Sequence, residues 1–286
     1  MGEMISTIRE RLVQPILDFN EIMQPVFQSI NTKMSEIGDL IRKHIDESDI
    51  ENAVTRFKQG IIETEEDLKI FKSVMVEMGY PPHEGIDIST VRTIAQSYKE
   101  NKESITPDVI QEFMCVYYDS KFIKTISLEW ENNKVIQKRL PILRNVVMAH
   151  NQGMYNVAIP TILTQLESLL VDAFHIKGKV NGEIIKILWE NLLKNNEDAN
   201  LNFDREIHDY YVKNILIGFE HGKAAGSEIS RNAILHGADI DYGQLLNSIK
   251  TILLFDCVVN AVFEMDEKKV SNGKTAVRNY RKANYR

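Results

Sequence analysis

Three neighbouring residues in the stretch 226–256 combine the side chains that phosphate chemistry requires. Arg231, Asn232 and His236 supply a fixed cation, an amide and a titratable imidazole. Each helical residue turns by about 100°, so Asn232 and His236 share a face, and the long Arg231 side chain can fold toward the same point. Gly237 follows at once and predicts a helix end, where the helix dipole favours a cation. Such a set suits a phosphate whose charge grows during reaction.

A second interpretation of the same residues is purely structural. An Arg and a His at this spacing occur by chance in many helical proteins, as a surface residue and a helix-terminal histidine. The surroundings favour the chemical interpretation, because Asn232 directly follows the arginine, Gly237 breaks the helix and a long apolar helix is predicted next. We expect the motif helix to begin at Ser227, directly after Gly226.

At these residues the sequence resembles the HEPN family (higher eukaryote and prokaryote nucleotide-binding domains). The family motif is an Arg, a polar residue, a short spacer and a His, and Arg231, Asn232 and His236 fill those places. The following DYGQLLNSIKTILLFD is similar to a segment of some bacterial HEPN-like proteins. The resemblance covers roughly residues 134–265. It implies an all-helical domain, metal-independent ribonuclease activity, and motifs that commonly meet across a homodimer interface.

Glu167 is a candidate for a supporting role beside the motif. It lies in the strongly apolar helix predicted over residues 155–174. A buried carboxylate without a partner is costly. Glu167 therefore either faces solvent or forms a salt bridge to Arg231 or Arg144 that positions the catalytic cluster.

His221 and Tyr242 are the other supporting candidates. His221 stands before Gly222 at a predicted helix end, where it either joins the site or serves a structural role. Tyr242 begins the last long helix, which is predicted over residues 242–264. Some toxin-type relatives carry a tyrosine two residues after the motif histidine, as a modification site for a partner enzyme. This chain has Ala238 there, and Tyr242 is too far along to match.

The segment after Glu267 differs in composition from the rest of the chain. It is rich in bases, includes Tyr280 and Tyr285, and has no acid. Bases interleaved with aromatic residues suit single-stranded RNA through phosphate attraction and base stacking, although a solvated tail has the same composition. The expected RNA-binding residues are Lys268, Lys269, Lys274, Arg278, Arg281 and Lys282.

Composition places the chain among globular proteins and excludes several classes. The chain is 43% apolar and 26% charged, and its net charge of −7 argues against a general nucleic-acid coat while permitting a local basic cleft. Cys115 and Cys257 lie in apolar helical patterns and are expected to be buried and reduced. The sequence shows no signal-like run, no stretch of 18 apolar residues and no motif for a cofactor or metal. We therefore expect a cytoplasmic protein without cofactor, metal or membrane contact.

Hydrophobic spacing predicts an all-α protein: a HEPN-like helical bundle with an additional N-terminal helical region. Residues 3–46 carry an apolar stripe at helical spacing, interrupted by Pro15 and Pro25. Thr64 is expected to cap a helix that is separate from one at 50–62. The predicted regions are 1–132, an N-terminal arm, sensor or regulatory region; 133–266, the HEPN-like domain; and 267–286, a basic tail.

The leading functional hypothesis is a metal-independent RNA endonuclease, since RNA carries its own nucleophile in the 2′-OH. His236 transfers protons and Arg231 holds the phosphate. Asn232 orients either His236 or the phosphate. The resemblance implies a bacterial toxin or anti-phage effector that cuts tRNA or other RNA and is restrained by an antitoxin or regulatory partner. The alternative is a non-catalytic helical module that binds a nucleotide or a protein.

Overall fold

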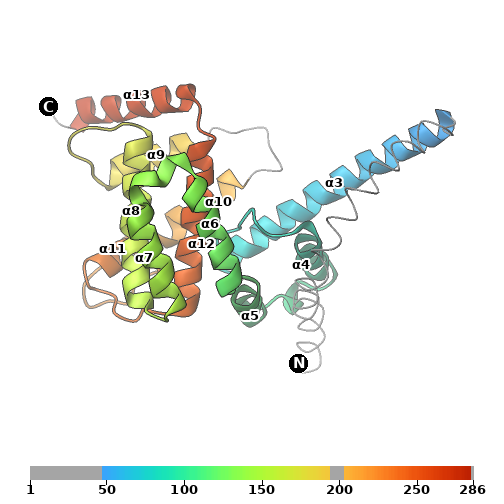
Figure 1. Cartoon of the computed structure of the whole chain (residues 1–286), viewed down its shortest axis with the longest axis horizontal. Helices are drawn as coiled ribbons and strands as arrows, with labels where there is room; N and C mark the ends of the chain where they lie inside the picture. Colours follow the sequence, from blue (N-terminus) through green and yellow to red (C-terminus); the bar gives the residue numbers. More distant parts are fainter. Residues whose placement is uncertain (1–46, 194–202, 285–286) are drawn as a thin grey trace. The chain divides into compact units, whose positions relative to one another are not determined.

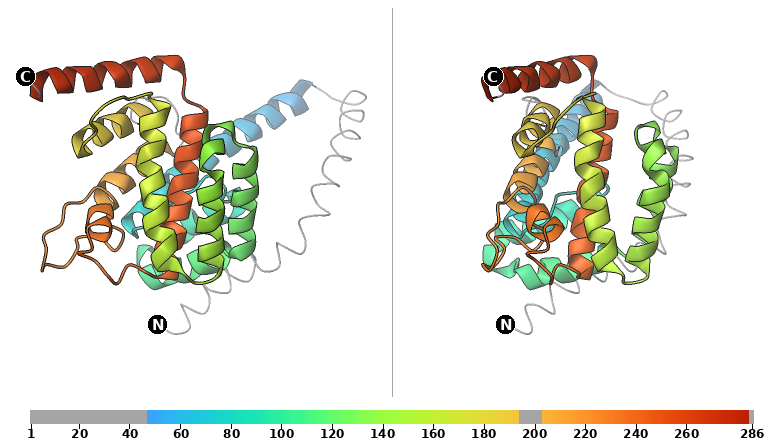
Figure 2. Two further views of the ribbon diagram at one scale, coloured as in Figure 1. Left: turned by 60° about the vertical axis from the view of Figure 1, so that its left-hand side comes forward. Right: turned by 90° about the vertical axis from the view of Figure 1, so that its left-hand side faces the viewer.

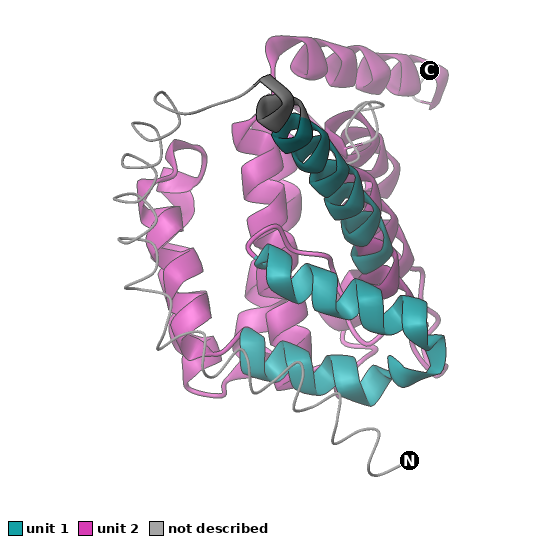
Figure 3. Cartoon of the chain, turned by 90° about the vertical axis from the view of Figure 1, so that its right-hand side faces the viewer, with its two compact units in different colours: residues 1–71, 86–117 teal, residues 72–85, 118–286 magenta. Residues whose placement is uncertain are grey.

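The structure, a computed structural model, describes residues 47–193 and 203–284 (Figure 1). Across these ranges the protein is all-α, with eleven α-helices and no strand, which confirms the predicted fold class. The apolar stripe predicted over residues 3–46 lies outside the described residues. Internal contacts divide the chain into two compact units (Figure 3). Unit 1 holds the chain up to Phe71 together with Ile86–Tyr117, and unit 2 holds Lys72–Gly85 and everything from Tyr118 onward.

Unit 1 is formed by α3 (Glu47–Glu77, as far as Phe71), α4 (Ile88–Glu100), the 3₁₀ turn η1 (Lys102–Ser104) and α5 (Pro107–Tyr117). A single buried carboxylate joins its first two helices. Asp67 accepts hydrogen bonds from Arg92 Nε at 3.2 Å and from Lys99 Nζ at 2.8 Å. Arg92 Nη2 also donates to Thr64 Oγ1 at 3.2 Å, so two side chains of α3 hold α4 in place.

The helix break predicted at Thr64 is wrong. Residues 47–77 form one continuous helix, and Thr64 Oγ1 donates to the carbonyl of Gly60 at 2.7 Å inside it. A threonine hydroxyl has two local options: it can cap a helix from outside or bond back to the preceding turn. Here the second option is realised, and sequence alone does not distinguish the two.

Unit 2 is a bundle built around one helix, α12 (Leu245–Phe263), which runs beside α8 (Figures 1 and 2). Every residue from Asn247 to Val259 is buried. α12 is long and apolar enough to cross a bilayer, but 78% of its most apolar window is buried within the protein, as expected for a core helix. The other elements are α6 (Ser120–Asn132), η2 (Lys134–Arg139), α7 (Leu140–Asn151), α8 (Tyr155–Ala173), α9 (Gly182–Leu193), α10 (Asp204–Asn214), α11 (Arg231–Leu235) and α13 (Glu267–Asn284).

A buried polar network fixes α12 within unit 2. The Asp256 carboxylate accepts from Trp130 Nε1 at 2.6 Å and lies 2.9 Å from His83 Nε2. His83 Nδ1 accepts from the Gly85 backbone N–H at 3.1 Å, so the ring proton is on Nε2 and points at Asp256. Asp256 is only 4% exposed, and the two donors satisfy its two oxygens. The network joins three segments that are distant in sequence.

The segment predicted to be a basic tail is the helix α13, which packs against α9. Its closest approach is at Gly273, where an added Cβ would lie 2.5 Å from two ring carbons of the fully buried Phe174. Its first turn is also fixed, because Lys269 Nζ donates to the Leu192 carbonyl at the end of α9. The helix therefore belongs to the bundle. Sequence analysis missed it because only two of its residues, Gly273 and Val277, are buried.

Candidate functional site

The motif lies on α11, a helix of five residues that begins at Arg231 and not near Ser227 as predicted. Ser230 is the N-cap: its hydroxyl accepts from the Ala233 N–H at 3.3 Å and lies 3.2 Å from the Ile217 carbonyl. Both serines are competent caps in sequence. Ser230 caps the helix because its hydroxyl also reaches the preceding loop and is completely buried there.

The end of α11 is where the sequence predicts it. Gly237 has φ +70°, its N–H donates to Ile234 O at 3.1 Å, and the Ala238 N–H donates to Ala233 O at 2.8 Å. These two bonds define a Schellman motif, in which glycine takes the left-handed position that other residues avoid. His236 is the C-cap, and its side chain is exposed. The imidazole is therefore presented to solvent beside the negative end of a short helix.

Arg231 is held on three sides. Its backbone N–H donates to Ile215 O at 3.0 Å, its Nη1 donates to Asn232 Oδ1 at 3.0 Å, and its Nη2 lies 2.6 Å from Glu167 Oε2. The predicted salt bridge between Glu167 and Arg231 is thus confirmed. The other predicted partner, Arg144, is paired with Glu131 on the surface.

The Arg231–Glu167 pair is partly shielded from water, with the two side chains 23% and 18% exposed. Burial raises the pKa of the Glu167 carboxyl, and the Arg231 guanidinium opposes this rise without cancelling it. Arg231 Nε is buried without a hydrogen-bond partner within the described structure. The pair thus fixes the position of α11 on α8.

Two exposed histidines, His221 and His236, contact the same aromatic ring, that of Phe219. The His236 ring stacks on Phe219, with centroids 5.6 Å apart and an interplanar angle of 20°. His221 meets the same phenyl ring edge-on, at 5.1 Å and 83°. Phe219 was not among the residues chosen from sequence. The helix predicted to end at His221 and Gly222 in fact ends at Asn214, so Phe219 and His221 lie in the loop that follows it. Phe219 brings together two imidazoles that are fifteen positions apart in the chain.

Tyr242 has a different environment. Its hydroxyl donates to the Asn156 carbonyl in the first turn of α8 at 3.2 Å. Next to it, an added Cβ on Gly243 would lie 1.3 Å from Asn156 Oδ1. The contact anchors the segment between α11 and α12 on α8, which is a positioning role.

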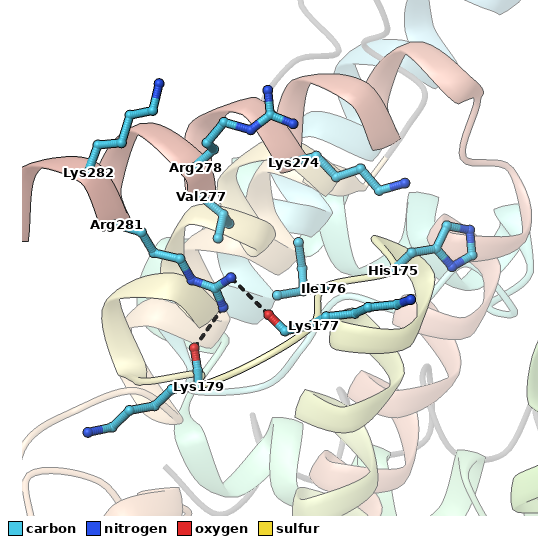
Figure 4. Close-up of a pocket in the computed structure, with 9 residues that line it drawn as sticks. All are labelled: His175, Ile176, Lys177, Lys179, Lys274, Val277, Arg278, Arg281 and Lys282. Carbon is cyan, nitrogen blue, oxygen red and sulfur yellow. Dashed lines mark hydrogen bonds between the residues drawn. The ribbon is translucent and has the colours of Figure 1, made fainter. Parts of the chain in front are cut away.

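The six cations predicted to bind RNA divide into two groups on α13. Lys274, Arg278, Arg281 and Lys282 line a groove with the loop 175–179 (Figure 4). Lys268 is exposed elsewhere on the helix, and Lys269 is bound to the end of α9. None of the motif residues lines this groove. In both orientations of Figures 1 and 2, α13 lies across one end of unit 2, away from α11.

Comparisons with known proteins returned no match. The chain matches no protein-family model, and the searches of curated proteins and of solved structures found no match. The resemblance to the HEPN family therefore rests on the motif residues and their surroundings.

The arrangement at α11 has the parts that proton transfer at a phosphate requires. It presents two exposed imidazoles, one anchored guanidinium and one amide, which come from the loop 215–230, the short helix α11 and its C-cap in the same unit. Among residues 47–193 and 203–284, no group of three or more His, Cys, Asp or Glu side chains is placed to hold a metal ion. The chemistry that the site offers is acid–base catalysis with electrostatic stabilisation.

Proposed function

We propose that the protein is a HEPN-type RNA endonuclease that cleaves by transesterification. The observation that carries the proposal is the pair of exposed imidazoles, His236 and His221, on one phenyl ring, with His236 at the end of the short helix that Arg231 begins. Cleavage of RNA needs one group to accept a proton and another to donate one. Two imidazoles at one site provide both.

The reaction follows from these roles. One imidazole removes the proton from the 2′-OH, whose oxygen attacks the adjacent phosphorus. The bond from phosphorus to the 5′-oxygen breaks, and the second imidazole, in its protonated form, gives its proton to that leaving oxygen. The products are a 2′,3′-cyclic phosphate and a 5′-OH. DNA is not a substrate, because it lacks the 2′-OH.

Arg231 stabilises the charge that develops on the phosphate. An arginine has five N–H donors, and the bonds to Asn232 and Glu167 occupy only part of the guanidinium. Because Glu167 anchors this side chain in place, little reorganisation is needed when the phosphate binds. Asn232 orients the guanidinium through the bond to Nη1. In this proposal Glu167 and Asn232 are positioning residues.

The biological role that accompanies this chemistry is a bacterial toxin or anti-phage effector acting on tRNA or other cellular RNA. Such an enzyme needs restraint by an antitoxin or a regulatory partner. A second version of the site has His236 from two copies meeting in a homodimer, as the family resemblance implies. In the homodimer version His221 is dispensable, so replacing His221 distinguishes this version from the site formed within one chain.

The test is cleavage of a labelled RNA by purified protein in the presence of EDTA, with product ends identified by mass spectrometry. His236→Ala should lower the rate by about 10²–10⁴-fold, and His221→Ala should do the same. Glu220→Ala, a change to the exposed residue beside His221, is the control for disturbing the loop and should retain the parental rate. The pH–rate profile of the parent should be bell-shaped, because one imidazole must be neutral and the other charged.

Two results would redirect the interpretation. Loss of activity in His236→Ala with full activity in His221→Ala would favour the homodimer version, which predicts a rate per chain that falls on dilution. RNA that is bound but not cleaved by the parent would favour the non-catalytic binding module.

A further inference from the structure

A groove of about 720 Å³ lies between α13 and the loop that joins α8 to α9. Figure 4 shows Lys274 from the helix and Lys177 from the loop extending toward the same end of the groove as the His175 ring, with Ile176 and Val277 between the two walls. The full lining is His175, Ile176, Lys177, Lys179, Lys274, Val277, Arg278, Arg281 and Lys282. All of these residues belong to unit 2.

The loop wall is built by the end of α8. The Ile176 N–H donates to Val171 O and the His175 N–H to Asp172 O, both at 2.9 Å, which makes another Schellman motif. The left-handed position in this motif normally holds glycine, but here His175 occupies it with φ +51°. A side chain at that position has a conformational cost, and it directs an imidazole into the groove.

Arg281 joins the two walls. Its Nη1 donates to the Lys177 carbonyl at 2.8 Å and its Nη2 to the Lys179 carbonyl at 2.7 Å (Figure 4). The planar guanidinium holds its two N–H donors in a fixed fork that matches the two carbonyls. Because the loop is bound through its backbone, the side chains of Lys177 and Lys179 remain free to meet a ligand.

The charge of the groove contrasts with that of the whole chain. Six of its lining residues are permanent cations and none of them is acidic, although the chain has a net charge of −7. Like charges gathered on one surface repel each other and oppose folding. An anionic ligand that spans the groove would relieve this repulsion.

A second hollow of about 660 Å³ continues from the groove past the same loop and shares His175, Ile176 and Lys177 with it. Its lining is largely apolar and includes Leu169, Val262 and Val270. Its acid, Asp172, is paired with Lys138 at 2.6 Å and with Arg139. We call the apolar lining of this second hollow, with Ile176 at its border with the groove, the shelf. Cations beside such a shelf match a ligand whose phosphates and flat bases alternate, which is the chemistry of single-stranded nucleic acid.

We propose that this groove binds single-stranded RNA, with Lys177, Lys274 and Arg278 on the phosphates and the shelf beside Ile176 under the bases. Arg281 is the positioning residue that holds the loop wall. The choice of RNA over DNA rests on the proposed ribonuclease function, whereas the affinity for a strand of phosphates does not. The groove is a docking site apart from the motif, so it determines which RNA is retained and for how long.

The test is fluorescence anisotropy with a labelled oligouridylate of about twelve nucleotides, a length within the range that single-strand sites contact. All variants carry His236→Ala so that binding is measured without cleavage. The double variant Lys177→Glu with Lys274→Glu should weaken binding by on the order of tenfold or more and lower the salt slope by about 0.7 for each lost phosphate contact. The matched control, Lys121→Glu with Lys124→Glu, makes the same charge change at exposed lysines outside the groove.

Equal affinities of the groove and control variants would overturn the proposal, and so would binding of anionic phosphatidylserine vesicles but not RNA. A parent that binds the oligonucleotide through the groove but never cleaves RNA would leave this inference standing while the proposed ribonuclease function fails. Arg281→Lys separates charge from positioning. It keeps the cation but loses the fork, so affinity should fall several-fold with an almost unchanged salt slope. Unchanged affinity would show that Arg281 does not position the loop.

Discussion

Asp256→Asn should destabilise unit 2 by about 3 kcal/mol or more, because of the donors that surround this side chain. Asp256 receives Trp130 Nε1–H on one oxygen and His83 Nε2–H on the other. An asparagine of the same shape has one oxygen and one amino group. The amino group would point a donor at a donor whichever way the amide turns.

The magnitude follows from three contributions. Hydrogen bonds to a charged group contribute about 1.5–3 kcal/mol each, and a neutral one about 1 kcal/mol. The variant keeps one bond in its weaker neutral form and loses the other. The donor left unsatisfied costs a further 1–3 kcal/mol or so, because the site is buried and water does not reach it.

Urea unfolding followed by tryptophan fluorescence measures this effect in the right part of the chain. The chain has two tryptophans, Trp130 and Trp189, and both are buried in unit 2. The control is Asp241→Asn, which makes the same change on an exposed side chain and should alter stability by no more than about 0.5 kcal/mol.

A double-mutant cycle tests the mechanism. Trp130→Phe removes one of the two donors, so Asp256→Asn should cost less in that background, with a coupling of about 1 kcal/mol or more. Trp189 remains as the reporter in the double variant. If Asp256→Asn costs no more than the control, or if the two changes are additive, the reasoning about donor conflict is refuted.

Two further predictions concern packing and pH. Gly273→Ala should lower stability by about 1–2 kcal/mol, although alanine usually favours a helix, because the new methyl group meets the buried Phe174 ring; a raised melting temperature would contradict the close approach of α13. Burial lowers the pKa of His150, whose Nδ1 lies 2.8 Å from Ser248 Oγ. The unfolded chain therefore binds the proton more readily, and stability should fall as the pH drops below about 6.5. His150→Gln should reduce this loss between pH 7 and pH 5 in urea titrations, and an unchanged pH dependence would assign the loss to other groups.

The sequence determined those features that depend on neighbours along the chain. The all-α class follows from apolar residues at helical spacing. The end of α11 at Gly237 follows from a residue that tolerates positive φ. The salt bridge of Glu167 with Arg231 joins distant residues, and the sequence left it open beside a pairing with Arg144 and a solvent-facing Glu167.

Local chemistry did not decide between residues of equal capability. Ser227 and Ser230 are both good helix caps, and Thr64 can either cap a helix or bond back within one. In each case the tertiary structure made the choice. Ser230 caps α11 because the Ile217 carbonyl lies within reach of its hydroxyl, a contact that no local rule contains.

Only the tertiary structure brought distant segments together. Phe219 gathers His221 and His236 because the loop after α10 folds back over α11. The cations of α13 face the loop 175–179 because Gly273 lets the helix approach Phe174 and Arg281 binds two loop carbonyls. Such contacts depend on packing between elements far apart in the chain. Periodicity and spacing report only on what one element does by itself.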